Sequence, residues 1–250
     1  MIVLGVDYNH KNSGEVLKCI EHLKKEGIPI KIVEHYKELI DSIIYDDKVI
    51  GGIRGNLSSS KVIPYLRKKI GIFYRGSLIK NPYTNNIFLL SPVGIDEVKD
   101  RNDIIKIIEY SMNFMKKNNN PKIGLLSYGR LSDYGRGDEI DKSLNDCEYI
   151  LKYFEKKYGN NITIEHRGIL IEEYLKEDFN IIIPYNGIMG NIIFRCLGLV
   201  CNLEGYGAVP LCERAINYID TSRSGGWKRY YNAVKYIYNN YLCKKDPYNV

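Results

Sequence analysis

The sequence lacks the apolar segments that mark membrane and secreted proteins. No apolar run approaches the roughly 18 residues that a membrane-spanning helix needs. The apolar stretch at the N-terminus is also too short for the hydrophobic region of a signal peptide. We therefore expect a cytoplasmic protein with no membrane partner.

Metal, disulfide and common nucleotide-binding patterns are missing as well. The six cysteines are scattered without a CxxC pair, so we predict neither a disulfide framework nor a metal site and expect reduced, mostly buried thiols. The chain has no GxGxxG at its start, no GxxxxGK followed by Ser or Thr, no GxSxG and no HExxH. These absences exclude the usual dinucleotide, P-loop, hydrolase and zinc-protease signatures.

Obvious acid–base groups are few. His10, His22, His35 and His166 are isolated from one another in the sequence, and each is compatible with a base or with a surface or structural role. Asp7 follows the first apolar segment, where it is either a carboxylate facing a ligand or a residue that holds a turn.

The composition is that of a compact protein: 250 residues, 44% of them hydrophobic and 26% charged. This length allows one large domain or two small ones. Residues 221–250 contain six Lys or Arg against one Asp, a surplus of five positive charges that accounts for most of the net charge of +6. The surplus indicates either a solvated helix face or an anionic partner; the basic residues are too sparse for a nucleic-acid arm.

Short β-branched runs alternate with amphipathic segments along the whole chain, which predicts a layered α/β protein with a mostly parallel central sheet. The predicted strands are residues 2–6, 30–33, 49–53, 87–90, 122–127, 162–165, 180–184 and 215–219. The predicted helices are residues 14–26, 36–44, 58–69, 102–117, 138–158, 190–200 and 227–242. In the last helix, aromatic residues recur with helical spacing, which favours a core face over a base-stacking surface.

Four loops between a predicted strand and a helix are rich in Gly, Ser, Asn and Arg. In a parallel sheet such loops gather at the carboxyl ends of the strands, where helix N-termini favour anions. Capping and turn formation explain each loop alone, but the four together favour a ligand site. The candidate anion-binding residues are Arg54, Asn56, Ser58, Ser127, Arg130, Arg136, Asn186, Gly190 and Asn191, and the fourth loop adds Ser222 and Arg223.

The order of these motifs resembles the phosphotransacetylase and PlsX-type phosphate acyltransferase superfamily. The motifs are VIGGIRGNLSSS, KIGLLSYGRLSDYGRGDEI, FNIIIPYNGIMGNIIFR, GYGAVPL and INYIDTSRSGG, followed by a terminal amphipathic helix. Within that superfamily the chain, and the string IIIPYNGIMGN in particular, resembles the MtxX family of methanogens, a methanogenesis marker family related to methyltransferases. The resemblance covers residue 49 to the C-terminus.

The resemblance implies a three-layer α/β/α fold of the isocitrate/isopropylmalate dehydrogenase type, with two lobes around a cleft. Residues 1–85 and 204–250 would form the first lobe and residues 86–203 the second. Gly190 and Asn191 match the family's Gly-Asn at the head of a helix. Gly207 and Pro210 match the PlsX-type GAPL turn, which implies a substrate-binding role for Gly207. Ser222 and Arg223 match the Ser-Arg of the phosphate and coenzyme A site, which implies catalytic roles for both.

The chain departs from the phosphotransacetylase pattern at one catalytic position. Arg229 stands where those enzymes carry an aspartate six residues beyond the arginine, and their HDLSRG fragment is replaced by YIDTSRSG. The general base that the resemblance implies is therefore absent. Motifs for corrinoid, S-adenosylmethionine or zinc-thiolate chemistry are also absent, so methyl transfer is implied by the family alone.

These observations leave three functional hypotheses. The first is an MtxX-like transferase linked to methanogenesis that binds a phosphate-bearing or other anionic acyl- or methyl-carrier substrate, such as coenzyme A, phosphate or a methanogen coenzyme. The second is a non-catalytic accessory subunit that retains the anion site and associates with methyltransferase subunits. The third, nucleic-acid binding by the last helix, has the least support. A homodimer is the expected assembly.

Overall fold

The structure, a computed structural model, describes residues 1–115, 121–214 and 216–245. The chain divides into two compact units, Met1–Phe73 with Gly205–Val250 and Tyr74–Glu204. Each unit has its own layers and core, and each is described separately below. The predicted lobe boundaries at residues 85 and 203 stay a prediction.

The first unit is built on a parallel four-stranded sheet in the order β10-β3-β1-β2. Its strands are β1 (Ile2–Gly5), β2 (Ile30–Val33), β3 (Gly51–Ile53) and β10 (Tyr218–Ile219). All residues of β1 and β3 are buried, as expected for strands that are covered on both faces. A further strand, β9 (Gly205–Leu211), is joined to β10 through an antiparallel bridge between Ala208 and Asp220.

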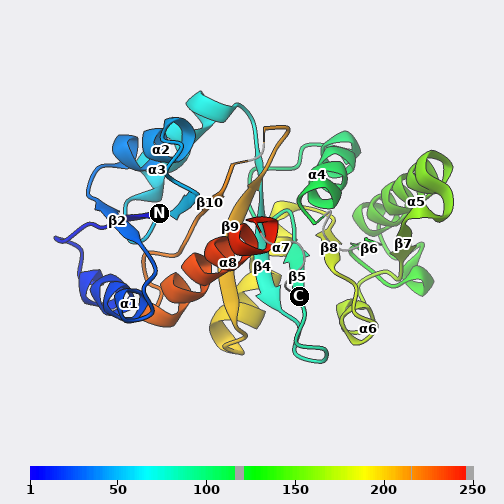
Figure 1. The fold of residues 1–250 in the computed structure, drawn as a ribbon. Coiled ribbons are helices and arrows are strands. Elements are labelled where there is room, and N and C mark those ends of the chain that lie inside the picture. Colours follow the sequence, from blue (N-terminus) through cyan, green and yellow to red (C-terminus); the bar gives the residue numbers. More distant parts are fainter. Residues whose placement is uncertain (116–120, 215, 246–250) are drawn as a thin grey trace. The chain divides into compact units, whose positions relative to one another are not determined.

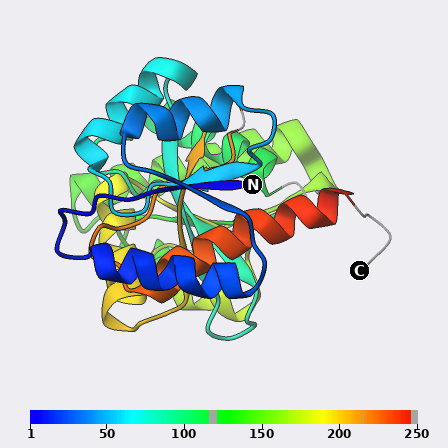
Figure 2. The same ribbon diagram turned by 60° about the vertical axis from the view of Figure 1, so that its left-hand side comes forward.

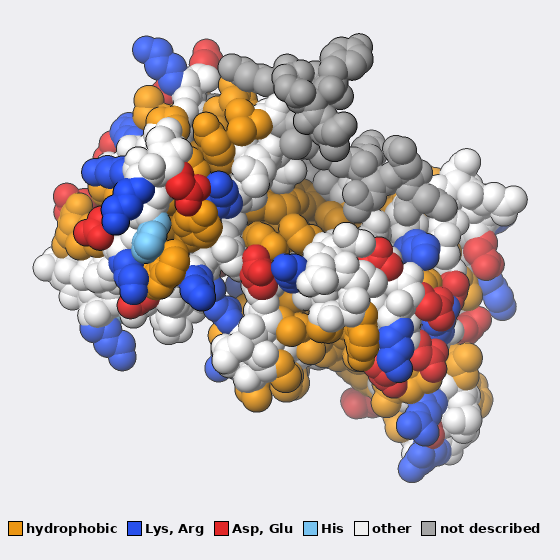
Figure 3. Space-filling view, turned by 60° about the horizontal axis from the view of Figure 1, so that its bottom comes forward, with side chains coloured by type: hydrophobic (Ala, Val, Ile, Leu, Met, Phe, Trp, Pro, Cys, Tyr) orange, Lys and Arg blue, Asp and Glu red, His pale blue; other side chains and the backbone are white. Residues whose placement is uncertain are grey.

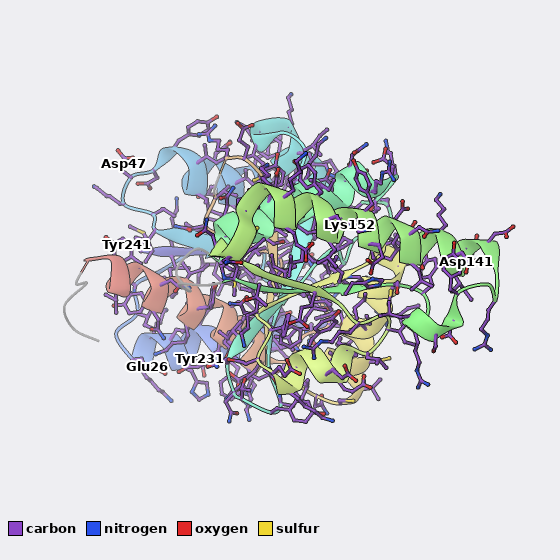
Figure 4. The ribbon with its side chains drawn as sticks, turned by 90° about the vertical axis from the view of Figure 1, so that its right-hand side faces the viewer. Glu26, Asp47, Asp141, Lys152, Tyr231 and Tyr241 are labelled. Atoms are coloured by element: carbon purple, nitrogen blue, oxygen red, sulfur yellow. The ribbon has the colours of Figure 1, made fainter. Side chains whose placement is uncertain are left out.

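Helices cover both faces of this sheet (Figure 1). On one face lie α2 (Tyr36–Tyr45) and α3 (Ser59–Ile70), and on the other α1 (Ser13–Lys25) packs beside α8 (Trp227–Lys245), as Figure 2 also shows. Tyr230 and Val234 of α8 are fully buried, which confirms the predicted core face there. Tyr231 instead donates a hydrogen bond of 2.6 Å to Glu26 at the surface of the unit (Figure 4).

The second unit contains a mixed sheet in the order β7-β6-β8-β5-β4. Only the pair β4 (Tyr74–Lys80) and β5 (Ile87–Leu90) is antiparallel. The strands β6 (Lys122–Leu126), β7 (Thr163–His166) and β8 (Ile181–Pro184) run parallel to one another and to β5. The carboxyl ends of β5, β6, β7 and β8 therefore share one edge.

The helices of the second unit also form two layers. On one side lie α4 (Arg101–Phe114) and α5 (Asp138–Tyr158), whose Asp141 and Lys152 are labelled in Figure 4. On the other side lie α6 (Ile171–Lys176) and α7 (Gly187–Phe194), which continues into a π-helical segment (Arg195–Val200). Residues of α6 and α7 share a buried cluster with Phe88, Leu126 and Ile182 of the strands. Both units are thus three-layer α/β/α structures, as the sequence predicts.

Most predicted elements are present within one or two residues of their expected bounds, and residues 30–33, 87–90 and 138–158 match in full. The expected single central sheet is wrong, because each unit has a sheet of its own. The sequence analysis missed β4, β9 and α6. Gly and Ser interrupt the apolar pattern of β4, two Gly and a Pro interrupt β9, and α6 is too short to show a helical period. Residues 116, 117 and 215 of two predicted elements lie outside the described residues.

Candidate functional site

The loops after β1, β3 and β10 leave the same edge of the first unit's sheet and bond to one another. Arg54 follows β3 and is only 5% exposed. Its Nη1 donates to the carbonyl of Leu57 at 2.5 Å, while its Nε donates to the Asp220 carboxylate and its Nη2 to the carbonyl of Thr221. The guanidinium therefore ties the loop after β3 to the loop after β10. Anion binding by Arg54 would require these bonds to break, and that role stays a prediction.

Asn56 joins the same loop to the end of β1. It is fully buried, its Oδ1 accepts the backbone N–H of Asp7 at 2.6 Å, and its Nδ2 donates to the carbonyl of Asp7 at 2.9 Å. This reciprocal pair uses both ends of the carboxamide. Asn56 therefore fixes the position of Asp7, a contact that the sequence could not show.

Two glycines, one in the loop after β3 and one in β9, are required by close packing. Gly55 has φ +61°, and a Cβ there would lie 1.8 Å from the carbonyl oxygen of Gly5. Gly207, a predicted substrate-binding residue, has φ +97°, and its Cβ would lie 2.4 Å from Ile219 Cγ2. Only glycine fits both the conformation and the space at these positions.

Arg223, a predicted catalytic residue, lies in the loop after β10 and is held from two sides. Its Nε donates to the carbonyl of Asn56 at 2.7 Å, and its Nη2 donates to Asp7 Oδ2 at 2.8 Å. Asn12, from the loop after β1, donates to the carbonyls of Arg223 and Gly225 at 2.9 and 2.7 Å. The Arg223 side chain nevertheless keeps 35% of its surface exposed, so an anchored guanidinium faces solvent at this edge of the sheet.

The two predicted serines of the first unit are accessible. Ser222 is exposed, with its hydroxyl 3.0 Å from that of Ser224, and the Tyr230 hydroxyl donates to its carbonyl at 2.9 Å. Ser58 lies before α3, with its hydroxyl 2.8 Å from that of Ser60. Ser222 thus stands beside Arg223 with a hydroxyl that can reach a ligand.

In the second unit, Ser127 is the end of a buried hydrogen-bonded chain. The Ser127 hydroxyl lies 3.0 Å from His166 Nε2, and His166 Nδ1 lies 2.8 Å from a carboxylate oxygen of Glu148. These are the contacts of a nucleophile, base and orienting acid. The hydroxyl also donates to the carbonyl of Gly129 at 2.9 Å, however, and Ser127 is fully buried. The chain of bonds therefore holds the loop after β6, and no substrate reaches the serine in this conformation.

The sequence analysis described His166 only as isolated from the other histidines, and the 39 residues between it and Ser127 gave no sign of their contact. The contact could have been inferred from the position of His166 at the end of β7, because β6, which Ser127 follows, is the parallel neighbour of β7.

Asn186 caps α7 and lies against a group of tyrosines. Its Oδ1 accepts the N–H of Met189 at 2.9 Å, and its Nδ2 donates to the hydroxyl of Tyr128. Tyr128 packs edge-on against Tyr185, whose hydroxyl donates to Asp146 at 2.7 Å. Burial, together with this bond to the Asp146 carboxylate, raises the pKa of Tyr185. Asn186 is therefore fully engaged as an N-cap.

The Gly-Asn motif packs α7 onto the loop after β5. A Cβ at Gly190 would lie 1.8 Å from the carbonyl oxygen of Pro92, and Asn191 Nδ2 donates to the carbonyl of Val93 at 3.0 Å. The partner loop was not singled out from the sequence. These contacts explain both residues of the motif by packing, and their predicted role in substrate binding stays a prediction.

The two arginines of the loop after β6 are exposed. Asp133 accepts the backbone N–H of Arg130 at 2.8 Å and the Nη1 of Arg136 at 2.7 Å. The backbone bond from Arg130, followed by the side-chain bond from Arg136, lowers the pKa of Asp133. Arg136 thus already has an anionic partner within its own loop.

The structure brings the predicted residues together in two groups, one in each unit. Arg54, Asn56, Ser58, Ser222 and Arg223 belong to linked loops of the first unit, and Gly207 lies in β9 against Ile219 and Asp220. We call Arg54, Asn56, Gly207, Ser222 and Arg223, with Asp7, the Ser-Arg site. Ser127, Arg130, Arg136, Asn186, Gly190 and Asn191 lie at the corresponding edge of the second unit's sheet. The predicted common cleft stays a prediction.

Other kinds of site find little support in the described part of the chain. No cluster of three or more His, Cys, Asp or Glu residues suited to a metal ion occurs in it, and none of its helices is long and apolar enough to cross a membrane.

The cysteines differ in burial. Burial raises the pKa of Cys19 to about 12. The expectation of mostly buried thiols is wrong for Cys196, in the π-helical segment, and for Cys201, directly after it, because both are exposed.

Charges of both signs are interspersed on the face drawn in Figure 3, where basic and acidic side chains alternate over the surface. Most of the ion pairs between Lys or Arg and Asp or Glu among the described residues include an exposed partner. Such pairs contribute little to stability individually. The buried Arg54–Asp220 pair is different because both side chains are largely enclosed.

Comparison with known sequences finds no matching family model but several archaeal relatives. An uncharacterized methyltransferase of Methanocaldococcus jannaschii is 52% identical over 243 residues, covering 95% of this chain and 96% of that protein. A Methanosarcina mazei protein, provisionally named methyltransferase mtx subunit X, is 32% identical over 90% of this chain and 85% of its own length. The protein of the same name from Methanosarcina barkeri is 30% identical over 82% of this chain and 76% of its own length.

Solved structures with the same fold include enzymes of phosphate acyl transfer. A branched-chain phosphotransacylase from Enterococcus faecalis superposes with a TM-score of 0.72 at 15% identity, covering 95% of this chain and 98% of that enzyme. A phosphotransacetylase from Streptococcus pyogenes gives a TM-score of 0.63 at 11% identity, with 97% and 94% covered. At these identities the likeness concerns the fold.

Proposed function

Because the chain belongs to the mtx subunit X (MtxX) family, we propose that it is a transferase linked to methanogenesis whose Ser-Arg site binds the anionic group of an acyl- or methyl-carrier substrate. Three findings support this proposal: the methyltransferase names of the relatives, the phosphotransacetylase-like fold and the geometry of the site. Fold alone does not specify chemistry, so the proposal depends on the site.

The observation that carries the proposal is the anchored, partly exposed guanidinium of Arg223. Two contacts, to the Asn56 carbonyl and the Asp7 carboxylate, fix its orientation. A guanidinium has five N–H donors in a planar fork, so donors remain for the oxygens of a phosphate, sulfonate or carboxylate. The exposed Ser222 hydroxyl adds a neutral donor beside it.

This arrangement can stabilise negative charge that develops during group transfer. A fixed donor aimed at such an oxygen lowers the barrier by about 3–4 kcal/mol in known acyl-transfer sites. Coenzyme A, inorganic phosphate, an acyl phosphate or a methanogen coenzyme such as coenzyme M could each present a suitable anionic group. The site contains no aspartate at residue 229, so a proton acceptor on the substrate or elsewhere in the chain would be required.

A second candidate, a non-catalytic accessory subunit of a methyltransferase complex, is favoured by two observations. Arg229 replaces the aspartate that the phosphotransacetylase resemblance implies, and the guanidinium of Arg54 is bonded to protein groups on three of its nitrogens. Such a protein would bind the anion without turning it over, and it would associate with methyltransferase subunits.

Thermal unfolding with added ligands tests the proposal. The screen contains phosphate, coenzyme A, acetyl phosphate and coenzyme M, and a ligand at 100 times its Kd stabilises the fold by about 2.7 kcal/mol. Arg223→Ala should abolish the shift. Arg214→Ala is the matched control, because Arg214 is exposed and precedes β10, at the other end of that strand.

The two candidates differ in turnover. Exchange of an acyl group between thioester and phosphate, or of a methyl group between carriers, in the presence of a ligand that binds would support the transferase. Ligand binding with no exchange, together with complex formation with purified methyltransferase subunits, would support the accessory subunit. Ligand shifts that survive Arg223→Ala, or the absence of any shift, would contradict the proposed site.

A further inference from the structure

Carboxylates of the first unit already occupy the anion-binding groups of the Ser-Arg site. Asp7 accepts a hydrogen bond from Arg223, and Asp220 accepts one from Arg54. At the first turn of α8, the backbone N–H of Trp227 donates to Glu15 Oε2 at 2.7 Å. Arg54, Arg223 and the Trp227 N–H therefore each have a negative partner before any ligand arrives.

Asp7 is held where it is and cannot readily give way to a ligand. Its backbone N–H donates to Asn56, which is fully buried, and its Oδ1 accepts the N–H of Asn9 at 3.1 Å. Its Oδ2 accepts Arg223 Nη2 at 2.8 Å. The carboxylate is 31% exposed, close to the 35% of Arg223. An anion bound to the remaining donors of Arg223 would thus have the Asp7 charge as a neighbour.

This neighbour discriminates between ligands by charge. The Arg223–Asp7 pair is neutral, so the pair has no net charge to offset the second negative charge of a dianion. At the dielectric constant of water, repulsion between that extra charge and a carboxylate about 4 Å away weakens binding by about sixfold relative to an uncharged residue 7, and by more in a partly enclosed site. The Ser222 and Ser224 hydroxyls can satisfy further oxygens without adding positive charge.

We propose that Asp7 is a specificity-determining residue that makes the Ser-Arg site selective for groups with one negative charge, such as a sulfonate, a carboxylate or a phosphodiester, over dianions such as a phosphate monoester. This inference rests on the proposed anion binding by Arg223. It deepens that function by naming the charge class of the substrate, and it assigns Asp7 to discrimination rather than to proton transfer.

Sulfate and methanesulfonate provide the test, because they share a tetrahedral sulfur centre and differ by one charge at neutral pH. Trp227 is the chain's single tryptophan and begins α8, directly after the loop that carries Ser222 and Arg223, so its fluorescence reports ligand binding there. Titrations of the full chain at fixed ionic strength give the ratio of the two dissociation constants for the wild type and for each variant.

Wild type should bind methanesulfonate at least as tightly as sulfate. Asp7→Asn removes the charge but keeps an oxygen acceptor for Arg223, so it should improve sulfate binding at least fivefold more than methanesulfonate binding. Asp7→Glu keeps the charge and should keep the wild-type preference. Asp47→Asn is the matched control: it removes the same charge from an exposed residue that precedes β3, far from that strand's carboxyl end, and should leave the ratio unchanged.

The outcomes separate this inference from the proposed function. If both anions bind through Arg223 but Asp7→Asn leaves their ratio unchanged, or weakens both equally, Asp7 only positions Arg223 and the inference is wrong. If neither anion binds, or Arg223→Ala leaves binding unchanged, the proposed function fails and the inference fails with it. Unfolding temperatures of the unliganded variants show whether a substitution has disrupted the fold. If Asp7→Asn does not fold, Asp7→Glu tests the inference, because a folded Asp7→Glu that loses the wild-type ratio of the two dissociation constants would contradict it.

Discussion

Replacing Arg54 by Met should destabilise the first unit, because it removes one partner of a buried ion pair. The Arg54 and Asp220 side chains are 6% and 16% exposed. Met preserves most of the aliphatic stem, so the main loss is electrostatic and in hydrogen bonds. Breaking a buried pair costs about 3–5 kcal/mol, since the remaining carboxylate is left without its counter-charge. The carbonyls of Leu57 and Thr221 also lose their donor.

Urea unfolding followed by Trp227 fluorescence measures the free-energy change in the unit that contains the pair, and thermal unfolding measures the change in unfolding temperature. For a protein of this size, each kcal/mol lowers the unfolding temperature by about 2–4 °C, so we expect a decrease of about 6–20 °C. Arg54→Met with Asp220→Asn should recover part of the loss because the orphaned charge is removed. A decrease in the free energy of unfolding below about 1 kcal/mol would contradict the structural role of Arg54 and would favour its predicted role in anion binding.

Three further predictions concern the loops. Gly190→Ala should destabilise the protein by more than about 2 kcal/mol because its Cβ would lie 1.8 Å from a backbone carbonyl oxygen. Gly14→Ala is the control: its Cβ would have no atom within 4 Å, so it should be neutral or stabilising by up to about 1 kcal/mol. Urea unfolding of the two variants compares these changes. Asn186→Ala should cost about 1 kcal/mol through the lost N-cap of α7, and the aspartate variant should restore it. NMR titration should show that the pKa of the Asp133 carboxyl lies below that of an aspartate in an unfolded chain. The contribution of Asp133 to stability is therefore present above the unfolded pKa and is lost as the pH falls through the folded pKa. Arg136→Ala should raise the folded pKa only in part, because the backbone bond from Arg130 remains.

The sequence predicted elements well where a single physical signal dominated. Residues 30–33 and 87–90 are short, β-branched or apolar runs between polar turns, and 138–158 has a long helical period, so their bounds were correct. The strand β4 was missed because buried Ser77 and a glycine look like loop residues in isolation. Its burial depends on tertiary packing, which local propensity does not report.

For the candidate site, the sequence analysis named residues but not the contacts between them. Arg54 was correctly placed in a strand-end loop, but its partner Asp220 is 166 residues away and could not be inferred from the motif. The same holds for Asp7 and Arg223, which are separated by 216 residues. Glycine and asparagine at a strand end suit both ligand binding and close packing, and the sequence alone does not show the close packing of Gly190 against the carbonyl of Pro92.

Crystals grown with methanesulfonate provide the most direct test of the claim that the Ser-Arg site binds a singly charged group. The account predicts density for the anion at the loop after β10, with its oxygens within hydrogen-bonding distance of Arg223 and of the Ser222 hydroxyl, while Asp7 keeps its bond to Arg223. Anion density elsewhere in the protein, with this loop bound only to its own carboxylates at saturating ligand, would contradict it.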